Sequence, residues 1–319
     1  NRLQALSGTT MALTGAGGFL GSYLLGALSH WNRTSGLQPC TIYAIDNFVV
    51  GNSTRIGNLA NDPNIVFLKS DITQALELDA VDWLIHCASI ASPSFFRQFP
   101  LETMDANIIG TRVVLEKART EGAKGVLLLS SSEIYGNPSP ENIPTPETYL
   151  GNVSCIGPRA CYDESKRAAE TLAWIYYNHH DVPVKTVRPF NVYGPGQRLD
   201  DGRIIPDLIG ALLSGEPLRL YSNGKATRAF CYVADATTAM LSILTDPNTT
   251  GEIYNVGNDE TEITIADLAD LALNVGQKFL DNCKLFLNSG IGSFPTSAAL
   301  PANKDIISLV FLSINFKIF

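Results

Sequence analysis

The chain has 319 residues, of which 45% are hydrophobic, and its formal net charge is −8. A chain of this length can bury a large core in one large domain or two closely joined ones. The acidic balance argues against nucleic acid or an anionic membrane as a partner, so an anionic ligand needs a local cluster of cations. The six cysteines form no C-x-x-C pair, and we expect no bound metal.

The sequence shows no signal peptide and no apolar run long enough to span a bilayer. We therefore expect a cytoplasmic protein with reduced thiols. The chain begins at Asn1 rather than at a methionine. If an N-terminal anchor has been removed, the secretory or Golgi lumen is the alternative compartment.

Short apolar runs alternate with amphipathic segments through the first half of the chain. The predicted strands are residues 11–13, 41–45, 65–68, 83–87, 126–130 and 184–188, and the predicted helices are residues 20–30, 101–121 and 162–178. This alternation predicts an α/β fold with a Rossmann-like, doubly wound parallel sheet. Ligands of such sheets bind beyond the carboxyl ends of the strands.

The stretch TGAGGFLG lies between the first predicted strand and the first predicted helix. Its first glycine permits a tight turn, its third lets the backbone approach a pyrophosphate, and its last lets the helix pack close to the sheet. The helix N-terminus then offers free N–H groups to the phosphates. The dinucleotide-binding residues expected here are Gly15, Gly18, Phe19, Leu20 and Gly21.

Asp46 ends the second predicted strand. A carboxylate there can accept hydrogen bonds from both ribose hydroxyls of an adenosine and would repel a 2′-phosphate, which favours NAD over NADP. It follows the glycine loop by about 30 residues instead of the usual ~20, and we attribute the excess to a longer polar connection at residues 30–39. Asn47 is expected beside it as a further cofactor-binding residue, and a turn-forming Asp-Asn pair is the alternative interpretation.

Three more residues follow predicted strands and are expected near the cofactor: Asp71, Ile72 and Ala88. We expect Asp71 beside the adenine, and a helix cap before Thr73 is its alternative role.

Tyr162 and Lys166 are four residues apart on a predicted helix and so share one face of it. An ammonium beside a phenol stabilises the phenolate, so the tyrosine can act as a base near neutral pH. The same lysine can hold a nicotinamide ribose. The pair follows the glycine loop and a strand that ends in Ser130-Ser131-Ser132-Glu133, and this combination predicts an active site.

The pattern changes after Arg188, where RPFNVYGPGQR is rich in loop formers. A helix at 205–213, strands at 218–221 and 230–233 and a helix at 234–244 are predicted next. We therefore assign residues 1–187 to an NAD-binding Rossmann domain and residues 188–319 to a mainly substrate-binding region, partly interleaved with the first. Beyond about Gly276 the periodicity fades, and the apolar C-terminus is predicted as a terminal strand or a tail.

From Gly8 to about Gly257 the chain resembles the extended short-chain dehydrogenases/reductases that modify nucleotide sugars. The segments SSSEIYGNP, GPRACYDESKR and ATRAFCYVAD are most similar to UDP-glucuronate decarboxylases (UDP-xylose synthases), and GPRACYDESKR is the most specific of them. The resemblance implies NAD as cofactor and a nucleotide sugar as substrate. It also implies a homodimer formed through the helices at 101–121 and 162–178.

In that family NAD⁺ removes a hydride from C4 of the sugar. The resemblance implies that Tyr162, activated by Lys166, takes the proton of the 4-hydroxyl, to which Ser131 hydrogen-bonds. The resulting 4-keto acid loses carbon dioxide, and Glu133 or a water that it orients protonates C5 with the assistance of Arg228. NADH then returns the hydride, so the nicotinamide is recycled.

Ser132 distinguishes between related enzymes. Glucose 4,6-dehydratases resemble this chain but carry Asp-Glu where it has Ser132-Glu133, and a serine is a poor acid for expelling a 6-hydroxyl. Glu133 also argues against simple 4-epimerisation, whereas mannose 4,6-dehydratases use a Ser-Glu pair as well and stay an alternative. The leading interpretation is a UDP-glucuronate decarboxylase. A nucleotide-sugar 4,6-dehydratase or 4-epimerase, and a non-enzymatic NAD or nucleotide sensor, are the alternatives.

The substrate-binding residues implied by the resemblance are Ser132, Asn191, Arg203, Tyr221 and Arg228. Guanidinium groups suit phosphates and carboxylates. Arg228 is expected to enter a hydrophobic strand, and Arg159 is a candidate for contacting the sugar carboxylate. Asn107 is expected to shape the helix opposite the active site. Ser165 departs from the family, which usually has glycine there.

Overall fold

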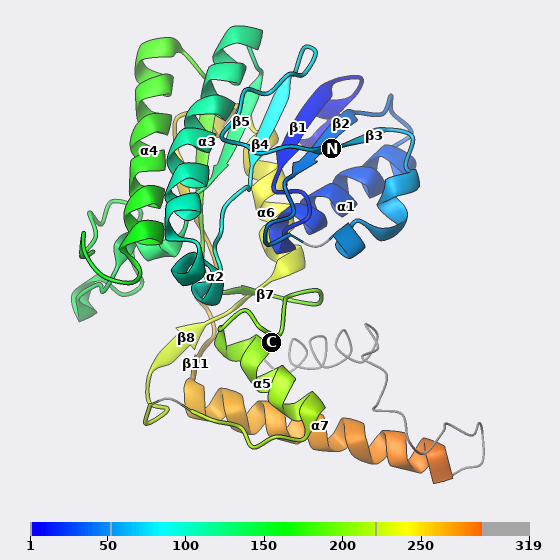
Figure 1. Ribbon diagram of the computed structural model, residues 1–319, viewed down its shortest axis with the longest axis vertical. Coiled ribbons are helices and arrows are strands. Elements are labelled where there is room, and N and C mark those ends of the chain that lie inside the picture. The colour runs from blue at the N-terminus through cyan, green and yellow to red at the C-terminus, as the bar shows by residue number, and fades with distance from the viewer. Residues whose placement is uncertain (1, 52, 221, 289–319) are drawn as a thin grey trace. The chain divides into compact units, whose positions relative to one another are not determined.

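The computed structural model describes residues 2–51, 53–220 and 222–288 (Figure 1). They fall into two compact units. The first comprises Asn1–Phe190 and Val233–Gly257, and the second comprises Asn191–Tyr232 and Asn258–Phe319. The first unit therefore extends past the predicted boundary at residue 187. It also includes a helix and a strand from the second half of the chain.

A seven-stranded sheet in the order β10-β6-β5-β4-β1-β2-β3 forms the centre of the first unit, and all of its pairings are parallel. Its strands are β1 (Thr10–Thr14), β2 (Thr41–Asp46), β3 (Ile65–Lys69), β4 (Trp83–His86), β5 (Gly125–Leu129), β6 (Val184–Pro189) and β10 (Ile253–Val256). The predicted doubly wound parallel sheet is thus confirmed. The strand order reverses between β1 and β4, the position where open α/β sheets bind their ligands.

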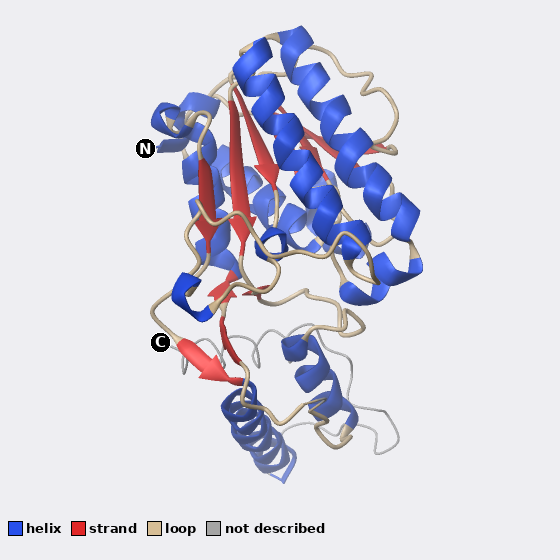
Figure 2. Cartoon of the chain, turned by 90° about the vertical axis from the view of Figure 1, so that its left-hand side faces the viewer, coloured by secondary structure: helices blue, strands red, loops and turns tan. Residues whose placement is uncertain are grey.

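Helices cover both faces of this sheet (Figures 1 and 2). They are α1 (Phe19–Thr34), α3 (Pro100–Glu121), α4 (Ala160–His180) and α6 (Val233–Thr245), while the short α2 (Pro93–Gln98) packs against α3. The long helices α3 and α4 pack on each other and on β4, β5 and β6, while α1 and α6 pack together on the other face. The short 3-10 helix η1 (Arg2–Leu6) precedes β1, and further 3-10 helices lie in the connections: η2 (Ser53–Arg55), η3 (Gly57–Asn61), η4 (Ser132–Tyr135), η5 (Pro140–Asn142) and η6 (Pro247–Thr249).

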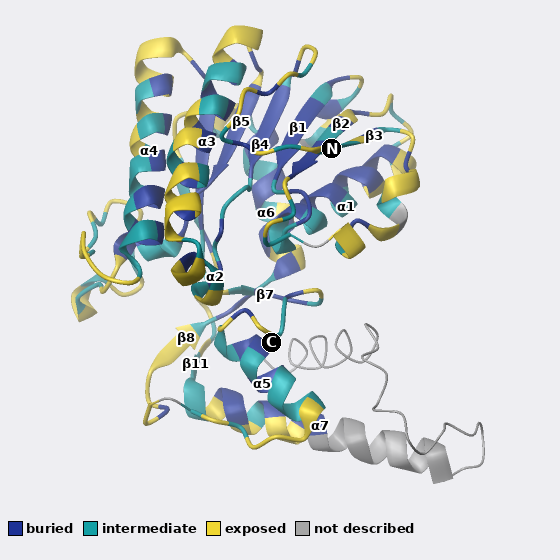
Figure 3. Cartoon of the chain, viewed as in Figure 1, coloured by how far each residue is buried: buried dark blue, intermediate teal, exposed yellow. Residues whose placement is uncertain are grey.

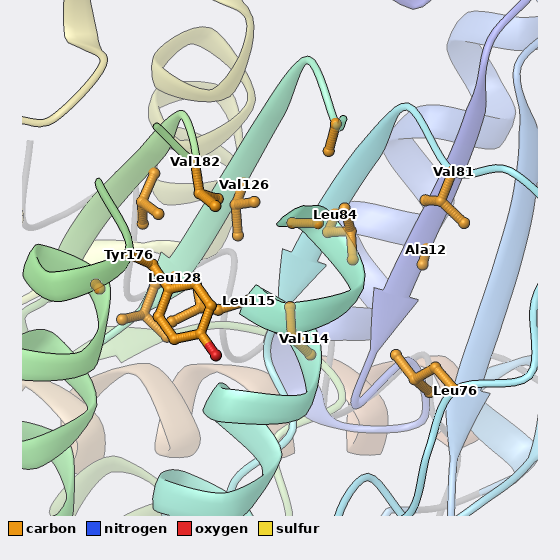
Figure 4. Close-up of a cluster of buried hydrophobic side chains, with 14 of the residues drawn as sticks. Ala12, Leu76, Val81, Leu84, Val114, Leu115, Val126, Leu128, Tyr176 and Val182 are labelled. Atoms are coloured by element: carbon orange, nitrogen blue, oxygen red, sulfur yellow. The ribbon is translucent and has the colours of Figure 1, made fainter. Parts of the chain in front are cut away.

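Burial explains why the central strands are apolar throughout. All five residues of β5, GVLLL, are buried, as expected for a parallel strand that has helices on both faces (Figure 3). Val126 and Leu128 of β5 meet Val114 and Leu115 of α3 and Tyr176 of α4 in one cluster (Figure 4). This core fixes the helix that carries Tyr162 against the strand that precedes Ser131.

The connection between β1 and β2 differs from the prediction. Helix α1 continues to Thr34, so part of the segment predicted as a loop is helical. Trp31 and Asn32 are buried there, and the Asn32 side chain donates to the Cys40 carbonyl and accepts from its N–H, both at 2.8 Å. The long spacing between the glycine loop and Asp46 therefore comes partly from an extended helix.

The second unit contains α5 (Ile204–Ser214), α7 (Ile265–Asn288) and two small sheets. Strand β8 (Thr227–Ala229) pairs antiparallel with β11 (Glu262–Thr264), and β7 (Val192–Tyr193) pairs parallel with β9 (Cys231–Tyr232). Tyr193, Ile209, Phe230 and Leu268 are among the residues of its core.

The strand predicted at 218–221 was wrong where the structure describes it: residues 218–220 form no strand, and the strand that pairs with β11 is β8. Tyr221 lies outside the described residues. Helix α7 continues past Gly276, where the sequence periodicity fades, to Asn288. The apolar C-terminal stretch lies outside the described residues. No helix in the described part of the chain is long and apolar enough to cross a membrane.

Candidate active site

The glycine loop lies at the switch point of the sheet. Gly15 has φ of +71°, and a Cβ on it would lie 2.6 Å from the backbone nitrogen of Ala88, in the loop after β4. The same Ala88 nitrogen donates to Thr14 Oγ1 at 3.3 Å. The conformation and the close approach both require glycine at position 15. Gly15 and Ala88, both predicted as cofactor residues, are therefore neighbours.

The two other predicted glycines shape the start of α1, which begins with Phe19 and Leu20. Gly18 is the N-cap residue, and no side chain caps the helix, so N–H groups of its first turn are open to an anion. A Cβ on Gly21 would lie 2.0 Å from the Gly15 carbonyl oxygen. Gly21 therefore packs the helix against its own loop, whereas the sequence pattern had assigned it to helix–sheet packing.

Asp46 is buried beside the glycine loop. Its Oδ2 accepts the Gly17 N–H at 2.8 Å, and its Oδ1 accepts the Phe48 N–H at 2.7 Å. Burial raises the pKa of the Asp46 carboxyl, although these N–H donors and the nearby Arg55 oppose the rise. The carboxylate is thus fixed in orientation at the predicted adenosine end of the site.

Arg55 is a residue of this region that the sequence reasoning missed. Its Nη1 donates to the Gly17 carbonyl at 3.2 Å. It is the last residue of η2, in the polar connection after β2, and no spacing rule marks it. The adenosine end of the site therefore contains a guanidinium as well as the Asp46 carboxylate.

Asn47 and Asp71 form local turns. Asn47 Oδ1 accepts the Val49 N–H at 3.1 Å, and Asp71 Oδ1 accepts the N–H and the hydroxyl of Thr73, both at 2.9 Å. The capping alternative for Asp71 is therefore formed, and contact with an adenine stays a prediction. Ile72 is buried against Gly110 of α3.

Tyr162 and Lys166 lie on α4, and both are buried. Lys166 Nζ lies 6.0 Å from the centroid of the Tyr162 ring and donates to the Leu129 carbonyl at 2.7 Å. Burial lowers the pKa of Lys166 to about 8. The lysine is thus mainly cationic at neutral pH, next to the phenol and to the end of β5.

Phe96 of α2 supports the tyrosine. The two rings stack with centroids 5.3 Å apart and planes 11° apart. The Cys161 thiol, beside the tyrosine, donates to the Phe96 carbonyl at 3.5 Å. No sequence motif indicates Phe96, because the contact joins segments that are far apart in the chain.

Ser131, Ser132 and Glu133 follow β5, as predicted. Ser131 caps η4, and its Oγ accepts the Glu133 N–H at 3.2 Å. The Glu133 carboxylate forms an ion pair with Arg159, whose Nε also lies 3.4 Å from Asp163 Oδ2. Arg159, a candidate for a sugar carboxylate, is thus already bound to two carboxylates of the protein, a pairing that no sequence pattern indicates.

A buried polar network anchors the carboxyl end of β5. Ser130 Oγ donates to Glu170 at 2.5 Å, and Glu170 forms an ion pair with Arg188 at 2.6 Å. Arg188 also donates to the Tyr135 hydroxyl at 2.7 Å, which in turn donates to Asn255 at 2.8 Å. This network links β5, α4, β6 and β10 and fixes the residues that flank Ser131.

Asn107 and Ser165 connect α3 to α4. Asn107 Nδ2 donates to Ser165 Oγ at 2.8 Å, and Ser165 Oγ donates to the Cys161 carbonyl at 2.5 Å. Both residues are buried. The serine that replaces the family's glycine therefore ties the helix of Tyr162 to its neighbour.

The other predicted substrate residues belong to the second unit. Asn191 has φ of +40° and donates from Nδ2 to the Ala229 carbonyl at 3.0 Å. Arg203 precedes α5 and lies 3.0 Å from Asp201. Arg228 was wrongly expected in a hydrophobic strand, since β8 is short and mostly exposed. The substrate contacts of all three stay predictions.

Comparison with known proteins gives the family. Residues 11–257 match the NAD dependent epimerase/dehydratase family, which covers the glycine loop, Asp46, Ser131 and the Tyr162–Lys166 pair. The chain belongs to this family. It is an extended short-chain dehydrogenase/reductase with NAD as cofactor, as the sequence predicted.

Several relatives within the NAD dependent epimerase/dehydratase family are similar over most of the chain. UDP-glucuronic acid decarboxylase 3 of Arabidopsis thaliana is 37% identical over 258 residues, which are 81% of this chain and 72% of that protein. UDP-glucuronic acid decarboxylase 5 of the same plant is 36% identical over 264 residues, covering 83% and 74%. A dTDP-glucose 4,6-dehydratase from Streptomyces venezuelae, solved with NAD bound, superposes with a TM-score of 0.72 at 25% identity, covering 83% and 80%.

Proposed function

We propose that this protein converts UDP-glucuronate to UDP-xylose and carbon dioxide through a 4-keto intermediate, with NAD recycled within each turnover. The observation that carries this proposal is the arrangement on η4. Glu133 supplies one carboxylate beside the helix of Tyr162, and Ser132 stands where an acid would be needed to expel a 6-hydroxyl. The names of the 36–37% identical relatives support the same reaction.

The residues present fit NAD. The Gly15–Ala88 contact keeps the loop after β1 free of side chains, and α1 begins without a side-chain cap, which suits a pyrophosphate. Asp46 would hold the adenosine ribose, and Lys166 the nicotinamide ribose. Bound NAD supplies a hydride acceptor that is regenerated in the same cycle.

The chain's own residues account for the proton transfers. The Lys166 ammonium favours the phenolate of Tyr162, which takes the proton of the 4-hydroxyl while the Ser131 hydroxyl hydrogen-bonds to the same oxygen. The C4 ketone then accepts the electrons of the bond to the carboxylate, and carbon dioxide leaves. Glu133, or a water that it orients, protonates C5.

Supply of UDP-glucuronate, UDP-glucose and dTDP-glucose to the purified protein tests this function. We expect carbon dioxide and a UDP-pentose from the uronate, and no 4-keto-6-deoxy sugar from the other two. Glu133→Gln should keep transient NADH formation but slow pentose release, because the C5 proton donor is lost. A 4-keto-6-deoxy product without turnover of the uronate would show a dehydratase instead.

We also propose that the protein is a homodimer through α3 and α4. Exposed apolar side chains along these two helices support this: Leu101, Met104, Ile109, Trp174 and Tyr177. Large apolar groups in water favour burial against a partner.

A further inference from the structure

Glu133, Arg159 and Asp163 form a linked set of charges beside Tyr162. The Arg159 guanidinium pairs with Glu133 through one nitrogen and lies 3.4 Å from Asp163 Oδ2 through another. It also lies 5.8 Å from the centroid of the Phe96 ring, which stacks on Tyr162. A single guanidinium thus connects the carboxylate on η4 with the helix of the proposed base.

Asp163 is the unusual member of this set. The residue is only 7% exposed, and its Oδ1 accepts no hydrogen bond from the residues that the structure describes. Burial raises the pKa of the Asp163 carboxyl; Arg159 opposes the rise, and the charges of Glu133 and Glu164 add to it. A buried carboxylate oxygen without a donor destabilises a fold, and an amide of the same shape would carry no charge to desolvate. The other carboxylate oxygen of Asp163, Oδ2, faces Arg159 Nε at 3.4 Å.

Arg159 links the two carboxylates. Its guanidinium holds the Glu133 carboxylate through a charge-assisted ion pair. Asp163 Oδ2, 3.4 Å from Arg159 Nε, holds the same guanidinium to α4. The side chain of Glu133 is 45% exposed, so without Arg159 little else would fix its orientation.

We propose that Arg159 and Asp163 are positioning residues for Glu133 in the decarboxylation. Arg159 fixes the Glu133 carboxyl where C5 of the sugar is protonated, and Asp163 holds the Arg159 guanidinium in the position that this requires. The inference rests on the proposed function. When carbon dioxide leaves, the carbon at C5 takes one proton from Glu133, and Glu133 regains one proton from solvent water, so the step consumes a single proton.

The test is turnover of UDP-glucuronate in D₂O. C5 of the pentose then carries one hydrogen from the substrate and one deuterium from solvent. We expect wild-type protein to place the deuterium in a single prochiral position. Arg159→Gln should label both positions and slow pentose release by about tenfold or more, the lower range of a lost acid–base contribution. Arg159→Lys keeps a cation and should restore most of the selectivity.

Asp163→Asn retains the shape of the side chain and removes its charge. We expect pentose release to slow and part of the label to reach the second position, because an amide holds the Arg159 guanidinium less firmly than a carboxylate does. Initial NADH formation should stay near the wild-type rate in both variants, since hydride removal at C4 precedes the step. The matched control is Glu164→Gln, which removes a charge from the next residue, where Glu164 lies 3.7 Å from Arg167.

The outcomes separate this inference from the proposed function. A single labelled position and unchanged pentose release in Arg159→Gln would overturn the positioning role alone. Pentose release at the wild-type rate in Asp163→Asn would show that Asp163 has no part in positioning Glu133. If the wild-type protein makes no pentose from UDP-glucuronate, the proposed function fails and this inference fails with it. Retention of NAD or NADH by each variant checks that it has folded.

Discussion

Lys166 keeps a positive charge in a place where burial opposes it. Its pKa falls from 10.5 to about 8 in the folded protein, chiefly through burial. Between these two values the unfolded chain binds the proton more tightly than the folded one. The stability cost of the charge is thus fully present below pH 8 and disappears as the pH rises to 10.5.

The lowered pKa of Lys166 leads to a stability prediction for Lys166→Met. Relative to the variant, the wild-type protein should gain stability as the pH rises from 7 to 10. The difference in Tm between the two proteins, measured by calorimetry at several pH values, checks this. A difference that stays constant with pH would contradict a buried, charged lysine. The variant should lose turnover at every pH, because it has no ammonium beside Tyr162.

Tyr162→Phe removes the proposed base and keeps the ring that stacks on Phe96. We expect turnover to fall by about two to four orders of magnitude, the contribution typical of general acid–base catalysis, with little change in substrate binding. Tyr176→Phe is a matched control on the same helix, since its phenol donates to Glu116. Near-normal turnover of Tyr162→Phe would remove this residue from the mechanism.

At the scale of elements, the turn from β1 into α1 depends on a glycine with a left-handed backbone. Gly15→Ala should destabilise the fold by about 1–3 kcal/mol, because its Cβ would meet the Ala88 backbone and φ of +71° is strained for alanine. Wild-type protein should release NAD or NADH on denaturation, since the cofactor is recycled, and the variant should release less.

Gly26→Ala is the control for this turn. Gly26 lies within α1, and a Cβ there would meet nothing within 4 Å. Alanine should therefore stabilise the helix by roughly 0.5–1 kcal/mol and leave the bound cofactor unchanged. Urea unfolding of the three proteins gives both values. Equal stabilities for Gly15→Ala and Gly26→Ala would contradict the role given to the turn.

At the scale of the whole molecule, the apolar residues along α3 and α4 predict the assembly. Light scattering should give twice the mass of one chain for wild-type protein. Trp174 is 60% exposed, and Trp174→Glu should shift the equilibrium toward monomers by placing a charge in the interface. A monomeric wild-type protein would contradict the dimer. Asn178→Glu, which changes an exposed polar residue on the same helix, shows whether added charge alone disturbs the fold.

The sequence by itself determined the parallel sheet, the glycine loop and the Tyr162–Lys166 pair. Each of these depends on local spacing: apolar periodicity, a turn that needs glycine, and two side chains on one turn of a helix. The sequence also placed Asp46 and Ser131 at one edge of the sheet. Each lies at the carboxyl end of a predicted strand, and parallel strands bring these ends together. NAD follows from these same local patterns.

Only the tertiary structure decided which distant side chains meet. Phe96 stacks on Tyr162, Arg55 reaches the glycine loop, and Arg159 joins Glu133 to Asp163. It also decided that β10 returns to the sheet and that residues 218–220 form no strand. Such contacts depend on how loops, sheet twist and helix packing bring segments together, and a periodicity within ten or twenty residues carries no record of them. The charges around Glu133 were therefore visible only in the folded chain.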